Sequence, residues 1–157
     1  MRRLVLAATA PGLGGVPGSP RVLWALATPR RYYQPDYYRR IAADVYGGVA
    51  RRDPDALLHG SLARFGHRPS PRGYAAQLYS IAGWTSVPWL RQPTLVLAGN
   101  DDPIVPLINA RILARLIPDA QLHVVQGGGH LFVLEQPDAV AQRVSDFLSA
   151  DQRQSSS

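Results

Sequence analysis

Two turns in the second half of the sequence carry the residues best suited to chemistry. The first holds the adjacent carboxylates Asp101 and Asp102 within residues 99–106, and the second is a run of three glycines that ends at His130. A carboxylate can hold an imidazole in the tautomer that accepts a proton from a nucleophile, as in a Ser–His–Asp triad. In one class of triads the acid precedes the histidine in the chain, as it does here. Alone, Asp102 would simply cap a helix and His130 would be a loop histidine, but the pair together favours a triad.

The elements around these turns alternate between strands and helices. We expect a buried strand over residues 94–98, a helix over 107–117, a second strand over 121–125 and an amphipathic helix over 137–148. This alternation predicts a parallel sheet with right-handed crossovers, in which the carboxyl ends of neighbouring strands share one edge. Because Asp102 and His130 each follow one of these strands, we expect their side chains to lie side by side and to form a hydrogen bond.

A helical and aromatic segment separates this core from an earlier strand. The apolar run at residues 3–8 predicts a buried strand, and a glycine- and proline-rich loop follows it. All 7 tyrosines and all 3 tryptophans lie between residues 13 and 91, where three helices are expected to begin near Pro35, Pro54 and Pro71. The expected organisation is a first core strand and loop over 1–12, a helical lid over 13–91, a C-terminal α/β core over 92–150 and a disordered tail over 151–157.

The acid turn and the histidine turn resemble the C-terminal signature of the α/β-hydrolase family, in the forms G-x-x-D-P-[IV]-V-P and G-G-H. By motif position, the resemblance assigns the triad acid to Asp102 and the base to His130, and it leaves Asp101 as a turn residue. It implies an α/β chain with a truncated α/β-hydrolase fold, in which the last strands of a parallel sheet carry flanking helices and an inserted helical lid.

A narrower resemblance covers nearly the whole chain. It is to the intracellular poly(3-hydroxyalkanoate) depolymerases of medium-chain-length polyester metabolism, and it rests on residues 2–10, 29–32, 83–86, 92–99, 106–109 and 130–132. The resemblance implies a serine carboxylester hydrolase that needs no cofactor, a hydrophobic ester or polyester substrate under an aromatic lid, a cytoplasmic location and association with a granule surface. Aromatics packed as the core of a small helical cap would give the same composition.

The nucleophile of such a triad is absent from these 157 residues. None of the serines has glycines two positions before and two positions after it, so there is no G-x-S-x-G elbow. The resemblance places that elbow and the oxyanion loop upstream of the strand at residues 3–8. We therefore expect the chain to be inactive alone, as a fragment or as a chain whose true start lies upstream.

Two other functions are compatible with the same residues. A genuine start at Met1 favours a non-catalytic binding module derived from this fold, which would bind a granule, a lipid surface or a partner. Among enzymes, the alternative is another α/β-hydrolase, either a carbon–carbon bond hydrolase or a haloperoxidase that uses no cofactor. Reading the sequence upstream in frame separates the module from the enzyme, and a substrate assay separates the enzymes.

Composition and charge argue against several further classes of function. The chain has no cysteine, which excludes disulfides and thiolate metal sites, and the surroundings of His123 in the sequence predict no metal site. The net charge of +6 and the sequence pI of about 10.3 come from arginines in scattered pairs without a nucleic-acid-binding motif, so no nucleic-acid partner is expected. No apolar run approaches the roughly 20 residues of a membrane helix, so no transmembrane segment is expected.

Overall fold

The core of the protein is a parallel sheet of three strands. The computed structural model describes residues 2–56, 70–82 and 89–154, and its strands are β1 (Leu4–Ala7), β2 (Thr94–Gly99) and β3 (Ala120–Val125). They are ordered β1-β2-β3, with Leu4 opposite Thr94 and Thr94 opposite Ala120. The prediction of a parallel sheet is confirmed, and β2 is fully buried, as its continuous apolar run predicts.

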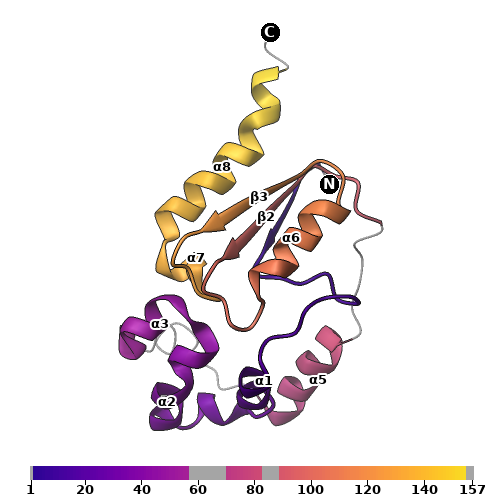
Figure 1. Ribbon diagram of the computed structural model, residues 1–157. Helices are drawn as coiled ribbons and strands as arrows, with labels where there is room; N and C mark the ends of the chain where they lie inside the picture. The colour runs from indigo at the N-terminus through magenta and orange to yellow at the C-terminus, as the bar shows by residue number, and fades with distance from the viewer. Residues whose placement is uncertain (1, 57–69, 83–88, 155–157) are drawn as a thin grey trace.

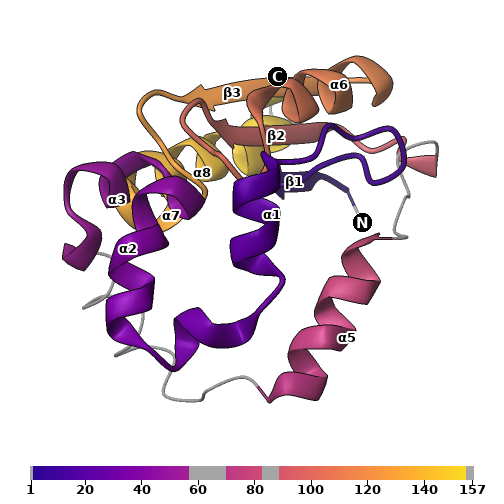
Figure 2. The same cartoon turned by 60° about the horizontal axis from the view of Figure 1, so that its bottom comes forward.

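Helices cover both faces of the sheet (Figure 2). On one face, α6 (Leu107–Leu116) packs against Val96 and Ala98, and on the other face α8 (Pro137–Gln154) packs against Leu95 and Leu97. Alternate residues of β2 therefore point into two different cores, as the pleat of a strand requires. Between β3 and α8 lies the short helix α7 (Phe132–Glu135), which the sequence pattern does not predict; Phe132 is fully buried in the second core.

The described part of the chain between β1 and β2 contains helices and no strand. Its elements are α1 (Pro20–Leu26), the 3-10 helix η1 (Pro29–Tyr32), α2 (Pro35–Tyr46), α3 (Gly48–Arg52) and α5 (Pro71–Ala82). We call these five elements together the helical segment. Figure 1 shows that it lies beyond the carboxyl ends of the strands. The helices expected near Pro35 and Pro71 are confirmed, and most of the helix expected near Pro54 lies outside the described residues.

The structure adds α1, η1 and α3 to the predicted helices. Ser19 caps α1 by accepting a hydrogen bond from the backbone N–H of Val22, and Gly47 separates α2 from α3 with a φ of 64°. A glycine adopts this left-handed conformation without steric cost, so two helices can meet there at an angle. Gly47 therefore ends α2, and the chain forms a new helix directly after it.

A buried arginine joins two parts of the helical segment. Arg31 of η1 donates a hydrogen bond from Nη1 to the hydroxyl of Tyr74 in α5 at 2.7 Å, and Nη2 donates to the hydroxyl of Tyr32 at 3.2 Å. Its guanidinium also lies over the Tyr32 and Tyr74 rings, at 4.6 and 5.2 Å from their centroids. These contacts connect α5 to the start of the segment.

The last helix is longer than its apolar pattern predicts. The apolar pattern predicts an end at Leu148, but α8 runs on to Gln154. It thus includes the first residues of the tail predicted over 151–157, and residues 155–157 lie outside the described residues. No glycine or proline occurs between Leu148 and Gln154 to stop it. Within the described ranges, no helix combines the length and the apolar character needed to cross a membrane.

Candidate active site

The acid turn holds the Asp102 carboxylate in one fixed orientation. Asp102 follows β2, and its side chain is 1% exposed. One oxygen, Oδ1, accepts the backbone N–H groups of Ile104 and Val105, each at 2.9 Å. A short side chain that bonds to backbone N–H groups two and three residues ahead stabilises a tight turn. The turn thus uses one oxygen of the carboxylate and leaves Oδ2 for another partner.

That partner is His130. Its Nδ1 atom lies 2.9 Å from Oδ2 of Asp102, and its side chain is 25% exposed. When Asp102 is ionised, Nδ1 carries a proton and donates a hydrogen bond to Oδ2, which leaves Nε2 as the basic nitrogen of the ring. The predicted contact between Asp102 and His130 is confirmed. In this arrangement Nε2 of His130 can act as a general base and then as a general acid, while the buried carboxylate of Asp102 orients the ring.

The histidine turn is held by backbone hydrogen bonds on two sides. The backbone N–H of Gly127 donates to Oδ1 of Asn100 at 2.7 Å, which connects the turn after β3 to the turn after β2. On the other side, the backbone N–H of His130 donates to the carbonyl of Tyr46 at 2.7 Å. His130 is therefore fixed to the sheet and to the helical segment at the same time.

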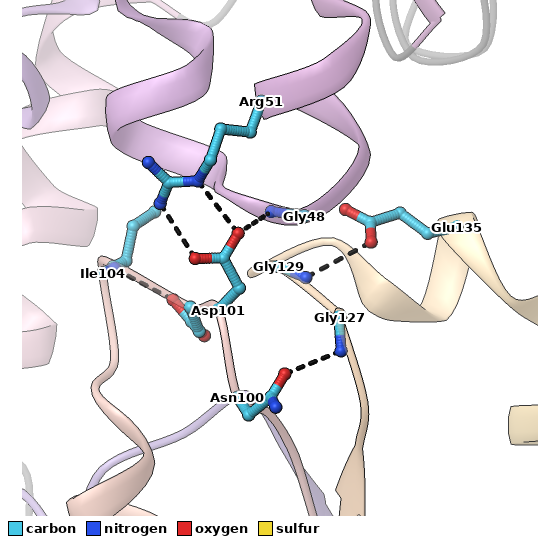
Figure 3. A network of polar contacts seen from close by, with 9 residues as sticks. Gly48, Arg51, Asn100, Asp101, Ile104, Gly127, Gly129 and Glu135 are labelled. Atoms are coloured by element: carbon cyan, nitrogen blue, oxygen red, sulfur yellow. Dashed lines mark hydrogen bonds and ion pairs between the residues drawn. The ribbon is translucent and has the colours of Figure 1, made fainter.

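Asp101 does not face His130. Its Oδ1 accepts from Nη2 of Arg51 at 2.9 Å, and its Oδ2 accepts from Nε of Arg51 at 3.0 Å and from the backbone N–H of Gly48 at 2.7 Å. Figure 3 shows Asp101 pointing toward α3, away from Asn100 and Gly127. The hydrogen bonds from Arg51, and then that from Gly48, lower the pKa of Asp101 below its ordinary value. The motif assigns Asp101 only to the turn, and these partners were not predicted.

A second carboxylate, that of Glu135, lies on the other side of Gly48 from Asp101 (Figure 3). Its Oε2 accepts the backbone N–H of Gly129 at 3.2 Å, and its carboxylate lies directly against Gly48. Burial raises the pKa of Glu135, although N–H groups of Gly129 and Val49 act in the opposite direction. Glu135 was also missed, because it lies on a short helix that has no repeating apolar pattern.

The described residues contain no cluster of side chains suited to bind a metal ion. Within 2–56, 70–82 and 89–154, no group of three or more His, Cys, Asp or Glu side chains is placed to hold a metal ion. The only acid–imidazole pair within those ranges is that of Asp102 and His130.

Comparison with known proteins agrees with the geometry. Residues 1–137 match the family model described as the alpha/beta hydrolase fold. The chain is 51% identical, over 156 residues, to a poly(3-hydroxyalkanoate) depolymerase of Ectopseudomonas oleovorans, a match that covers 97% of this chain and 54% of that protein. The chain therefore spans about half the length of the curated relative.

Solved structures show the same fold. An enol-lactonase from Burkholderia xenovorans LB400 superposes with a TM-score of 0.72 at 23% identity and covers 95% of this chain and 56% of its own. A thermophilic esterase from Thermogutta terrifontis gives a TM-score of 0.67 at 26% identity, with 94% of this chain and 56% of its own covered. With its parallel sheet, its acid and histidine turns and the family match over residues 1–137, this chain belongs to the α/β-hydrolase family.

Proposed function

We propose that this chain supplies the acid and the base of a serine carboxylester hydrolase that acts on hydroxyalkanoate esters. The observation that carries the proposal is the hydrogen bond between the buried Asp102 and His130, at the carboxyl ends of two neighbouring strands. The identity of 51% to a poly(3-hydroxyalkanoate) depolymerase supports the choice of substrate class. The serine nucleophile and the oxyanion donors would come from residues that are not among these 157.

In this proposal the chemistry is acyl transfer in two steps. Nε2 of His130 takes the proton of the serine hydroxyl while the serine oxygen attacks the ester carbonyl. The carbonyl oxygen then becomes an oxyanion. When the tetrahedral intermediate collapses, His130 returns the proton to the leaving alcohol and an acyl-enzyme remains. A water molecule, deprotonated in turn by His130, then attacks the acyl carbonyl. The bond to the serine oxygen breaks, His130 returns the proton to that oxygen, and the acid is released. Throughout, Oδ2 of Asp102 accepts the Nδ1 proton and stabilises the imidazolium.

The helical segment would act as a lid for an oily substrate. It covers the end of the sheet at which Asp102 and His130 lie, and it exposes large aromatic side chains, including Trp24 at 81% and Tyr79 at 85%. Exposed aromatics of this size favour contact with an apolar surface. They support a proposed location at a polyester granule in the cytoplasm, where a hydrophobic acyl chain would enter beneath the lid.

The test needs both the chain alone and the chain joined to a nucleophile. The chain alone is assayed with a chromogenic medium-chain acyl ester beside a His130→Ala control, and equal rates are expected because no serine is activated. A chimera is then made with the part of the Ectopseudomonas depolymerase that precedes the matched region, where the resemblance expects the elbow. This chimera should hydrolyse the ester.

In the chimera, His130→Ala should lower kcat by a factor on the order of 10⁴–10⁶, and Asp102→Asn should also lower it strongly, because triad members act as a unit. A folded chimera in which both variants keep full activity would overturn the proposal. Turnover by the chain alone above its His130→Ala control would reveal a nucleophile within these 157 residues. A folded chimera that cleaves only carbon–carbon bonds would show that the proposed substrate class, hydroxyalkanoate esters, is wrong.

A further inference from the structure

The two adjacent aspartates of the acid turn face different parts of the molecule. Asp102 bonds to His130, whereas Asp101 bonds to Arg51 and to the backbone of Gly48 in α3. Arg51 is 50 residues away in sequence, so the contact between them joins the helical segment to the sheet. One turn therefore serves both partners, with Asp102 against the histidine turn and Asp101 against α3.

The contact of Asp101 lies next to a hydrogen bond on His130. The junction between α2 and α3 is Tyr46-Gly47-Gly48, and the Tyr46 carbonyl accepts the backbone N–H of His130 at 2.7 Å. A Cβ atom at Gly47 would overlap the carbonyl oxygen of Asp101, and one at Gly129 would overlap that of Tyr46. The junction is thus packed directly on both turns, with glycine at the points of closest approach.

The bonds made by Asp101 are stronger than those of an ordinary surface ion pair. The side chains of Arg51 and Asp101 are 50% and 37% exposed, and an isolated pair at such exposure contributes little. Here, however, two N–H groups of one guanidinium approach both carboxylate oxygens, and the Gly48 N–H adds a third charge-assisted hydrogen bond. These three hydrogen bonds fix both the orientation of α3 and its distance from the acid turn.

We propose that Asp101 is a positioning residue, which holds the α2–α3 junction on the catalytic turns and, through the Tyr46 carbonyl, fixes the backbone of His130. The proposal rests on the role proposed for His130 as the base. In this proposal the helical segment and His130 are mechanically coupled, so that release of α3 from Asp101 also frees the histidine turn. Asp102 orients the ring of His130, and Asp101 keeps its backbone in place.

Hydrogen–deuterium exchange of the full 157-residue chain tests this coupling without any measurement of activity. In Asp101→Asn and in Arg51→Gln, peptides spanning residues 43–52 and 127–135 should exchange about fivefold faster. The peptide of β2, residues 94–99, should keep its rate, because the core is not opened. Arg51→Lys retains the charge and one hydrogen bond, so it should recover part of the protection.

The matched control is Arg39→Gln. Arg39 makes ion pairs with Asp36 at 3.1 Å and with Asp55 at 2.7 Å, and among the described residues it takes no part in the hydrogen bonds of Asp101, Asp102 or His130. This variant should leave the peptide over 127–135 unchanged. If Asp101→Asn and Arg51→Gln speed exchange only in the peptide over 43–52, or speed all peptides equally, the coupling to His130 is wrong. The exchange experiment does not depend on ester hydrolysis. The positioning role of Asp101 can therefore fail while the proposed function stands, and the proposed function can fail while the positioning role stands.

Discussion

Oδ2 of Asp102 and Nδ1 of His130 lie 2.9 Å apart although 28 positions separate the two residues in the sequence. The carboxylate is nearly inaccessible to solvent, and its other oxygen is held by two backbone N–H groups of its own turn. The orientation of the imidazole therefore depends on a carboxylate that the local backbone has already fixed. Such preorganisation requires no rearrangement at the moment when a proton is transferred.

Replacement of Asp102 by asparagine should reverse the tautomer of His130. The asparagine side chain can still accept the N–H groups of Ile104 and Val105 through Oδ1, but its amide would present N–H to Nδ1 of the histidine. Nδ1 would then become the acceptor, and the proton of the neutral ring would move to Nε2. Nitrogen-15 NMR of the ring reports this directly. Arg39→Gln, which changes an ion pair of α2 and no hydrogen bond of His130, is the control that should keep the original tautomer. An unchanged tautomer in Asp102→Asn would contradict the hydrogen bond.

Two glycines with nearly the same positive φ should respond differently to alanine. Gly47 has a φ of 64° and Gly127 a φ of 66°, so each substitution places an alanine at a positive φ, at a cost of at least about 1–2 kcal/mol. At Gly127 the added methyl meets open space, whereas at Gly47 it would overlap the Asp101 carbonyl. Gly47→Ala should therefore cost roughly 2 kcal/mol more in free energy of unfolding, as measured by urea denaturation. Equal costs would show that the α2–α3 junction is not packed on the acid turn.

The sequence predicts the parts of the site that local pattern controls. A fully apolar run predicts β2, the acid and glycine-rich turns follow β2 and β3, and parallel pairing then brings Asp102 to His130. The choice of Asp102 over Asp101 as the acid came from motif position, and the structure places only Asp102 against the histidine. These predictions succeed because each depends on a short stretch of chain and on the geometry of a parallel sheet.

The contacts that the sequence could not predict join distant segments. Asp101 and Arg51 are 50 residues apart, and nothing in the scattered arginines distinguishes Arg51 from its neighbours. The helix α3 has only five residues, too few for an apolar period, and it begins where Gly47-Gly48 predicts a stop. The N–H of Gly48 at its start donates to the Asp101 carboxylate, and the Glu135 carboxylate lies against the same glycine. Tertiary contacts therefore stabilise a helix that local preference does not.

The carboxylates of Asp101 and Glu135 should change stability in opposite directions with pH. The pKa of Asp101 is lowered from an ordinary 3.8, so its contribution is present above that value and is lost as the pH falls through the folded pKa. The pKa of Glu135 is raised from an ordinary 4.5, so its contribution is present below that value and is lost as the pH rises through the folded pKa. Free energies of unfolding measured between about pH 3 and pH 7 should show both effects.

Single variants separate the two carboxylates. Asp101→Asn should remove part of the loss of stability below an ordinary aspartate pKa and leave the higher range unchanged. Glu135→Gln keeps an oxygen to accept the Gly129 N–H, and it should remove part of the decline above an ordinary glutamate pKa. If Glu135→Gln instead steepens that decline, the pKa of Glu135 is not raised by burial.

Asn109 should be the most sensitive polar residue of the core outside the site. It is fully buried in α6, and its amide accepts the Val16 N–H at 2.7 Å and donates to the carbonyls of Val16 at 2.8 Å and of Pro106 at 3.2 Å. Asn109→Leu has nearly the same volume but leaves the backbone of Val16 without these partners, at a cost of about 2–4 kcal/mol in free energy of unfolding. The adjacent Ile108→Ala is the control, because Ile108 is 38% exposed and should lose less than about 1 kcal/mol. Urea denaturation of both variants measures the two changes in free energy of unfolding. A cost for Asn109→Leu no larger than that for Ile108→Ala would mean that the loop after β1 is not held by this amide.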